Sequence, residues 1–200
     1  GTPAFRGACA RHVTNRKGFS CSPDEVFATS GVAQAMMLTC KALLKPGDEV
    51  VLFDPVDFLF GKSIDIAGGR QVLSKVSWET LEFDLEGLKE LVTPKTKMIC
   101  ICNPHNPYGR VLRRDELKAM VDLAVDHDLW ILSDEIWSDI VYDGREHIAT
   151  ASIEGASNRT LSLYGFSKTF ALAGLQLGFI VAQNPELMAK VKGAAPGYFY

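Results

Sequence analysis

Short apolar runs alternate with amphipathic segments along most of this chain, and this alternation limits the folds open to it. The apolar runs lie at residues 49–53, 71–76, 97–102, 129–133, 160–164 and 177–181. Segments with the apolar spacing of helices lie at residues 31–44, 56–67, 84–91, 113–127 and 185–192. Strands that alternate with helices are typical of a mostly parallel sheet with crossover helices. The sequence therefore predicts an α/β fold, and we expect residues 1–200 to form one domain.

Local signals mark the ends of two of the predicted helices. Pro46 and Gly47 follow the helix at 31–44 and would end it, because proline and glycine both interrupt helices. Asp84 opens the helix at 84–91, where its carboxylate can accept a backbone hydrogen bond as an N-cap.

Composition and charge argue against several classes of function. The chain has 200 residues, 47% hydrophobic and 22% charged, which is enough for one sizeable core. Its net charge of -3 provides no concentrated positive field for nucleic acid. No apolar run approaches the roughly 20 residues needed to cross a membrane, and the first residues do not resemble a signal peptide. We therefore expect a soluble, cytoplasmic protein that binds neither nucleic acid nor membranes.

Cysteine and histidine positions argue against a disulfide framework and a metal centre. The five cysteines are scattered and include no CxxC pair, so we expect free thiols in a reducing compartment. Cys100 and Cys102 share one face of a predicted strand and are expected to pack in the core. The histidines show no metal-ligand spacing. Motifs of nicotinamide enzymes, nucleotide hydrolases and zinc peptidases are also absent from the sequence.

Three polar motifs follow three of the predicted strands. They are NPHNPYG at 103–109, SDEIW at 133–137 and GFSKTF at 165–170. Because ligands collect at the carboxyl ends of strands in open α/β sheets, we expect Asn106, Asp134 and Lys168 to converge. Lysine can form an imine with an aldehyde, and aspartate can keep a pyridine nitrogen protonated. Asparagine can donate to a ring oxygen, so the three groups suit pyridoxal 5'-phosphate.

A fourth motif, ATSGVAQA at 28–35, opens directly into a predicted helix. The backbone amides of Gly31, Val32 and Ala33 would face an anion there, and the helix dipole favours negative charge. We therefore predict a phosphate-binding site at this helix terminus.

Each motif also has an ordinary structural explanation. A Ser-Gly pair is often only a cap, NPHNP is a turn sequence, and an isolated lysine is normally a solvated surface charge. Their joint occurrence at successive strand ends favours a site. His105 has two interpretations, a proton shuttle near the ring or a turn residue bonded to the backbone.

These motifs, with PGDEVVLFDPV at 46–56, resemble the large domain of pyridoxal-phosphate enzymes of the aminotransferase class I/II superfamily, the fold-type I group, over about residues 27–184. The resemblance implies a three-layer sandwich with helices on both sides of the sheet. It also implies that Lys168 forms a Schiff base with the cofactor, that Asp134 holds the pyridinium nitrogen, and that Ser167 is a further cofactor-binding residue. Relatives add a small domain built from both chain ends, which this chain is expected to lack, and form homodimers.

The sequence departs from the family pattern at several cofactor positions. Asp57 stands where many relatives have a ring-stacking aromatic residue, so Phe58 or Phe60 would have to take that role. Trp137 replaces a frequent tyrosine and can donate but not accept a hydrogen bond. Gln176 replaces a frequent arginine, and Gly165 replaces a serine, so we expect a weaker grip on the phosphate.

The resemblance implies an aminotransferase that acts on an amino acid and a 2-oxo acid, with Lys168 and Asp134 as the catalytic residues. NPHNPYGR, SDEIWSDIVYDGREH and AGLQ resemble instead the branch that contains cystathionine β-lyases. A carbon-sulfur β-lyase is therefore the alternative, and a non-catalytic fragment is a second one. The sequence leaves the substrate and the choice between amino transfer and elimination open.

Overall fold

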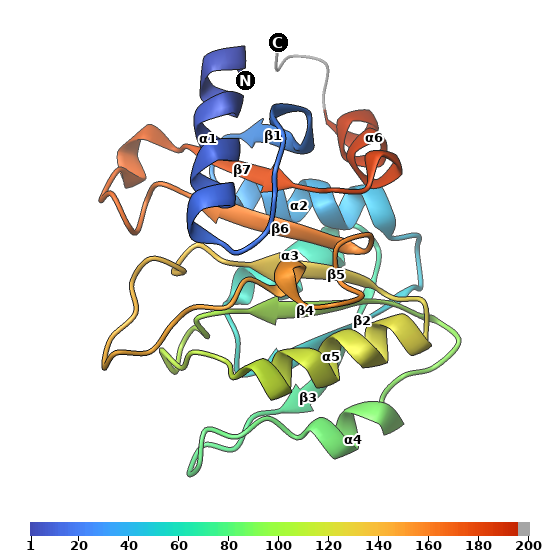
Figure 1. Ribbon diagram of the computed structural model, residues 1–200. Coiled ribbons are helices and arrows are strands. Elements are labelled where there is room, and N and C mark those ends of the chain that lie inside the picture. The colour runs from blue at the N-terminus through green and yellow to red at the C-terminus, as the bar shows by residue number, and fades with distance from the viewer. Residues whose placement is uncertain (196–200) are drawn as a thin grey trace.

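A computed structural model of the chain describes residues 1–195, and in them one seven-stranded sheet lies between two layers of helices (Figure 1). The strand order is β1-β7-β6-β5-β4-β2-β3. The strands are β1 (Val26–Thr29), β2 (Glu49–Asp54), β3 (Arg70–Lys75), β4 (Thr96–Cys102), β5 (Trp130–Asp134), β6 (Thr160–Gly165) and β7 (Gly178–Val181). This architecture confirms the predicted α/β fold with a mostly parallel sheet flanked by helices.

The strands from β2 to β6 run parallel, whereas β7 runs antiparallel to both β6 and β1. All strands except β1 were predicted within one residue at each end, and the runs of β4 and β5 are apolar on both faces. The short β1 was not predicted, and only its two end residues, Val26 and Thr29, are buried.

The helices are α1 (Pro3–Arg16), α2 (Val32–Leu43), α3 (Phe58–Ile66), α4 (Leu85–Glu90), α5 (Arg114–Asp126) and α6 (Pro185–Ala194). Single 3-10 turns lie at Pro23–Glu25, Thr150–Ser152 and Ala173–Leu175. The helices from α2 to α6 were predicted within two residues at each end. The predicted cap at Asp84 is confirmed, since its carboxylate accepts a hydrogen bond from the backbone N of Gly87 at 2.9 Å.

Helix α1 was missed by the sequence prediction because its apolar pattern is weak. Only Cys9, Ala10 and Val13 of its residues are buried. Its start does carry a usable signal: Thr2 caps the helix by accepting from the backbone N of Phe5 at 3.2 Å, and Pro3 occupies the first helical position.

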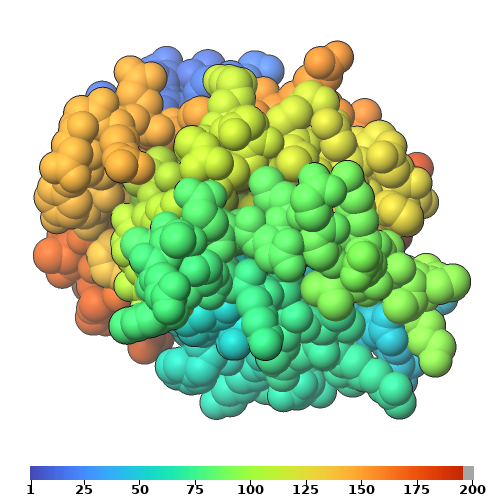
Figure 2. Space-filling model, turned by 90° about the horizontal axis from the view of Figure 1, so that it is seen from below, coloured from blue at the N-terminus to red at the C-terminus, as the bar shows by residue number. Residues whose placement is uncertain are grey.

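The sheet separates the core into two layers. On one face, α2, α3 and α6 pack against the strands, and the clustered residues there include Cys100 and Cys102, as predicted. On the other face, α5 and α4 cover the middle and lower strands, and α1 covers β1, β6 and β7. Figure 1 shows α1 and α5 in front of the sheet and α2 behind it. Seen from below, the green segment that contains α4 covers the lower end of the molecule (Figure 2).

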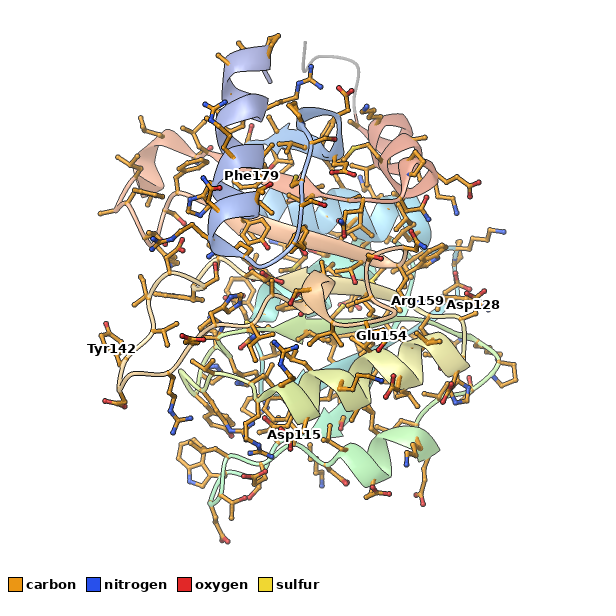
Figure 3. All side chains as sticks on the ribbon, viewed as in Figure 1. Asp115, Asp128, Tyr142, Glu154, Arg159 and Phe179 are labelled. Atoms are coloured by element: carbon orange, nitrogen blue, oxygen red, sulfur yellow. The ribbon has the colours of Figure 1, made fainter. Side chains whose placement is uncertain are left out.

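The two edges of the sheet differ in the residues that they carry. Figure 3 shows Tyr142 at the edge toward which the parallel strands run, whereas Arg159 and Asp128 lie at the opposite edge. These two form an ion pair there, with Nη1 and Oδ1 3.4 Å apart. None of the helices within residues 1–195 is long and apolar enough to span a membrane.

Candidate functional site

The carboxyl ends of three neighbouring strands place the predicted polar residues at one edge of the sheet. Asp134 is the last residue of β5, and it is in register with Cys102 of β4 on one side and Leu163 of β6 on the other. The loops that carry Asn106 and Lys168 therefore begin beside Asp134. This arrangement follows from the parallel order of the strands.

Asp134 is a buried carboxyl group, with 6% of its surface exposed. Its Oδ1 accepts a hydrogen bond from the backbone N of Ile136 at 3.1 Å. Burial raises the pKa of Asp134 to about 7, and the negative charges of Asp57 and Glu135 add to the shift, while Lys168 opposes it. A buried carboxyl group of this kind gains stability when a cation comes next to it. A protonated pyridine nitrogen meets that requirement.

Lys168 is an exposed residue in the loop between β6 and β7. Its Nζ atom is 4.7 Å from the centre of the Trp137 ring. Trp137 belongs to the turn that follows Asp134, and the positive charge of Lys168 lowers the pKa of Asp134. The structure thus brings Lys168, Trp137 and Asp134 together.

Asn106 is joined to the start of α3 by a hydrogen bond from its Nδ2 to Oδ2 of Asp57, 3.0 Å long. The other carboxylate oxygen of Asp57 caps α3 by accepting from the backbone N of Leu59 at 2.9 Å. The negative charge of Asp57 also raises the pKa of Asp134. From the sequence, Asp57 was only a departure from the family pattern, and these two bonds were not predicted.

The N-terminus of α2 lies against β6 and β7, the two strands that are connected by the loop carrying Lys168. Gly31 caps this helix with a φ of 87°, a conformation that favours glycine. A Cβ atom on Gly178 would lie 2.8 Å from the carbonyl carbon of Gly31, and one on Gly165 would lie 2.9 Å from Cγ2 of Val32. The first amides of a helix have no partner within the helix, so Val32 and Ala33 offer donors to an anion here.

The remaining predicted site residues lie at the rim. Phe58, the first residue of α3, is 75% exposed, and Gln176 has the left-handed φ of 48° in the exposed loop before β7. Ser167 is half-buried. Within residues 1–195, none of these three forms a side-chain hydrogen bond or a ring contact with Asn106 or Asp134. Phe60 is fully buried in the core beneath α3, so it cannot serve as the ring-stacking residue.

A buried network next to Asp134 was also missed by the sequence analysis. Glu135 accepts hydrogen bonds from the hydroxyl of Tyr164 at 2.7 Å, from Oγ of Ser133 at 3.0 Å and from the backbone N of Thr150 at 3.0 Å. These contacts fix the turn after β5 to β6 and to the segment that follows. The sequence offered only an adjacent acidic pair, which is common at helix caps.

A second unpredicted contact links α1 to this turn. Lys17 is almost fully buried, and its Nζ donates to Oγ of Ser138 and to Oδ1 of Asp139, both at 2.7 Å. Oδ2 of Asp139 in turn accepts from Oγ1 of Thr169 at 3.4 Å. The residue that follows Lys168 is therefore tied to the same turn that holds Trp137.

His105 matches the turn interpretation rather than the proton shuttle. Its backbone N donates to the carbonyl oxygen of Arg110, and its carbonyl oxygen accepts from the backbone N of Gly109. Burial lowers the pKa of His105 to about 4, and its ring lies edge-on to Phe83. A histidine whose pKa lies this far below 7 is rarely protonated near neutral pH, which makes it a poor proton shuttle.

Comparisons with known proteins are consistent with this geometry. The family described as aminotransferase class I and II matches residues 1–200. An aspartate aminotransferase of Pyrococcus abyssi is 37% identical over 195 residues, which are 96% of this chain and 50% of that protein. An aromatic-amino-acid aminotransferase of Thermococcus litoralis is 37% identical over 181 residues, or 89% of this chain and 46% of that protein.

A solved structure gives the same picture. The N-succinyldiaminopimelate aminotransferase from Mycobacterium tuberculosis superposes with a TM-score of 0.93 at 30% identity, covering 97% of this chain and 51% of that one. The chain therefore spans about half the length of the relatives that it matches.

Proposed function

Since the chain belongs to the aminotransferase class I and II family, we propose that it is the cofactor-binding part of an aminotransferase that uses pyridoxal 5'-phosphate. The observation that supports this most directly is Asp134, a buried carboxyl group with a raised pKa at the end of β5. A cationic ring nitrogen beside this group would relieve the cost of its burial. The proposed reaction moves an amino group between an amino acid and a 2-oxo acid.

The residues at this edge suit the cofactor chemically. Lys168 supplies a primary amine for the aldehyde, Asp134 an acceptor for the protonated ring nitrogen, and Asn106 a donor for the ring oxygen. The amides of Val32 and Ala33, with Gly31 before them, supply donors for the phosphate. Gly178 approaches Gly31 so closely that a side chain would not fit at position 178. This supports phosphate binding by backbone amides at the N-terminus of α2.

When bound, pyridoxal phosphate withdraws electrons from the α carbon of an amino acid attached to it. This chain contributes the groups that hold and move protons. Asp134 keeps the proton on the ring nitrogen, because a carboxylate paired with a cation forms a charge-assisted hydrogen bond worth about 1.5–3 kcal/mol. The Nζ atom of Lys168, when free, could take a proton from the α carbon of the substrate and deliver it to another atom.

We assign the remaining candidates to the rim of the cofactor site. Trp137 lies beneath the Lys168 amine and presents its ring face to it. Phe58 is free to pack over a ring, since its side chain is largely exposed. Ser167 and Gln176 flank Lys168 and β7 and are proposed to bind the phosphate end.

Organisation and location also belong to the proposal. The chain is proposed to correspond to the large domain of the family. The last five residues of the chain lie outside the part that the structure describes. A homodimer and a cytoplasmic location stay predictions from the sequence and the family resemblance.

Covalent labelling tests the cofactor assignment. The chain is incubated with pyridoxal 5'-phosphate, reduced with borohydride, digested and analysed by mass spectrometry. We expect the reduced cofactor mainly on Lys168, with much less label on any other lysine. Labelling spread evenly over surface lysines would contradict the proposed site.

A product assay tests the reaction. The enzyme is given an amino acid with 2-oxoglutarate, and separately cystathionine without an acceptor. We expect a new amino acid in the first mixture. Pyruvate and ammonia from cystathionine alone would favour the β-lyase, and no product in either mixture with Lys168 labelled would favour a chain that binds cofactor without turning it over.

A further inference from the structure

Asp57 binds two partners that lie on different elements of the fold. Its Oδ1 accepts from the backbone N of Leu59 at 2.9 Å and so caps α3. Its Oδ2 accepts from Nδ2 of Asn106 at 3.0 Å, across a sequence separation of 49 residues. Because both oxygens are engaged, the side chain is held between the start of α3 and the loop after β4.

The bond to Asp57 determines which way the Asn106 amide points. An asparagine amide has an oxygen at one end and an NH2 group at the other, and a half-turn exchanges them. A carboxylate has no hydrogen to donate, so Asp57 can hold only the NH2 end of Asn106. The nitrogen of Asn106 therefore faces Asp57, and a second hydrogen on the same nitrogen stays available.

We propose that Asp57 is a positioning residue, which keeps the N–H end of Asn106 in place for the ring oxygen of the cofactor. The inference rests on the proposed function, because it assigns a role within that site. If the amide turned over, its oxygen would face the ring oxygen, and two acceptors would then repel each other. Asp57 prevents this, and its positioning effect on cofactor affinity acts through Asn106, separately from the effect of its charge on Asp134.

Two substitutions separate this role from helix capping and from charge. In D57N the side-chain oxygen still caps α3, since asparagine caps as well as aspartate does. Its NH2 group then faces Asn106 and selects the oxygen end, which reverses the amide. D57S removes the same charge and keeps a good cap, but a hydroxyl can both donate and accept, so it selects neither end of the Asn106 amide.

Equilibrium dialysis of chain 1–200 against pyridoxal 5'-phosphate measures the effect. We expect D57S to bind the cofactor about threefold more weakly than the parent chain, because it loses one hydrogen bond. D57N should bind about tenfold more weakly or worse, because it loses the same bond and adds a repulsion between two acceptors. In an N106A background, D57N and D57S should bind equally. Thermal unfolding of each variant serves as the folding control.

NMR of the cofactor-free chain provides a second measurement. The side-chain NH2 signals of Asn106 are identified by their loss in N106A, and we expect them to shift in D57N and in D57S by different amounts. Cofactor binding by D57N that equals or exceeds that of D57S, or unchanged Asn106 signals, would overturn the role of Asp57. If the parent chain takes up no cofactor and Lys168 is not labelled, the proposed function fails as well.

Discussion

The Nζ atom of Lys168 lies 4.7 Å from the centre of the Trp137 ring, three residues beyond the buried carboxyl group of Asp134. The contact draws an exposed lysine back over the end of β5, where a solvated lysine would otherwise point outward. A lysine above an indole face gains about 0.5–1 kcal/mol at an exposed position. The contact therefore orients the Lys168 amine but holds it only weakly.

Replacing Lys168 with alanine is expected to abolish covalent attachment of the cofactor and to lower amino transfer by at least about a hundredfold, because the amine is also the proposed base. K190A is the matched control, since Lys190 of α6 also lies over an indole, with its Nζ 5.1 Å from the ring of Trp130 in β5. Labelling and activity are measured in both variants. Equal losses in K168A and K190A would contradict the assignment.

The raised pKa of Asp134 predicts an unusual pH dependence of stability. The folded chain keeps a proton on this group up to about pH 7, whereas the unfolded chain loses it near pH 4. The stability that this group contributes is therefore present at acidic pH and is lost as the pH rises through about 7. D134N, which cannot ionise, should be more stable than the parent chain at about pH 8, by up to a few kcal/mol, and equally stable near pH 4.

Thermal unfolding of D134N and the parent chain across this pH range measures the difference. The histidines with lowered pKa values are present in both proteins, so their contribution cancels. With cofactor bound, the order at about pH 8 should reverse, because only the carboxylate can pair with the ring nitrogen. A stability difference that does not change with pH would mean that Asp134 is ionised throughout.

Lys17 is expected to carry more stability than an exposed lysine pair. K17M leaves Asp139 and Ser138 without their buried partner, and we predict a loss of about 2–3 kcal/mol, reduced from a fully buried pair because Asp139 is 20% exposed. K118A is the control, since the Lys118–Asp122 pair is exposed and should leave the unfolding midpoint unchanged. Urea unfolding measures both, and similar effects in the two variants would contradict the assigned role.

Gly178 should tolerate no side chain. Its missing Cβ would lie 2.8 Å from backbone atoms of Gly31, which cannot move aside as a flexible side chain could. We therefore expect G178A to lose about 1–3 kcal/mol of stability and to bind the cofactor more weakly, because the N-terminus of α2 shifts. G193A is the counterpart: among residues 1–195, no atom beyond its chain neighbours and its own helix backbone lies within 4 Å of the added carbon, and alanine should stabilise α6 slightly. Calorimetry and dialysis distinguish the two.

Much of the fold could be predicted from local pattern. The runs that became β4 and β5 are apolar on both faces, and parallel strands buried on two sides carry such runs. The edge strand β1 and helix α1 could not be predicted, because only a few of their residues are buried. The antiparallel direction of β7 depends on which neighbour the strand meets, and no local signal records that.

The candidate site divides in the same way. The loops that carry Asn106, Asp134 and Lys168 were predictable, because chemical type and position after a strand are both visible in the sequence. The bond between Asp57 and Asn106 and the burial of Lys17 were not, because each joins segments that only the folded sheet brings together. Phe60 had suitable chemistry for the site in the sequence, but in the structure its side chain is buried in the core.

The antiparallel pairing of β6 with β7 turns the segment that bears Lys168 into the connection of a hairpin. Gly165 and Gly178 are opposite each other in that pairing, so both ends of the connection are pinned to one point on the sheet. Residues within this connection can therefore change in sequence without altering the pairing of the two strands that support it. Lys168 therefore lies in a loop whose two ends are fixed side by side on the sheet.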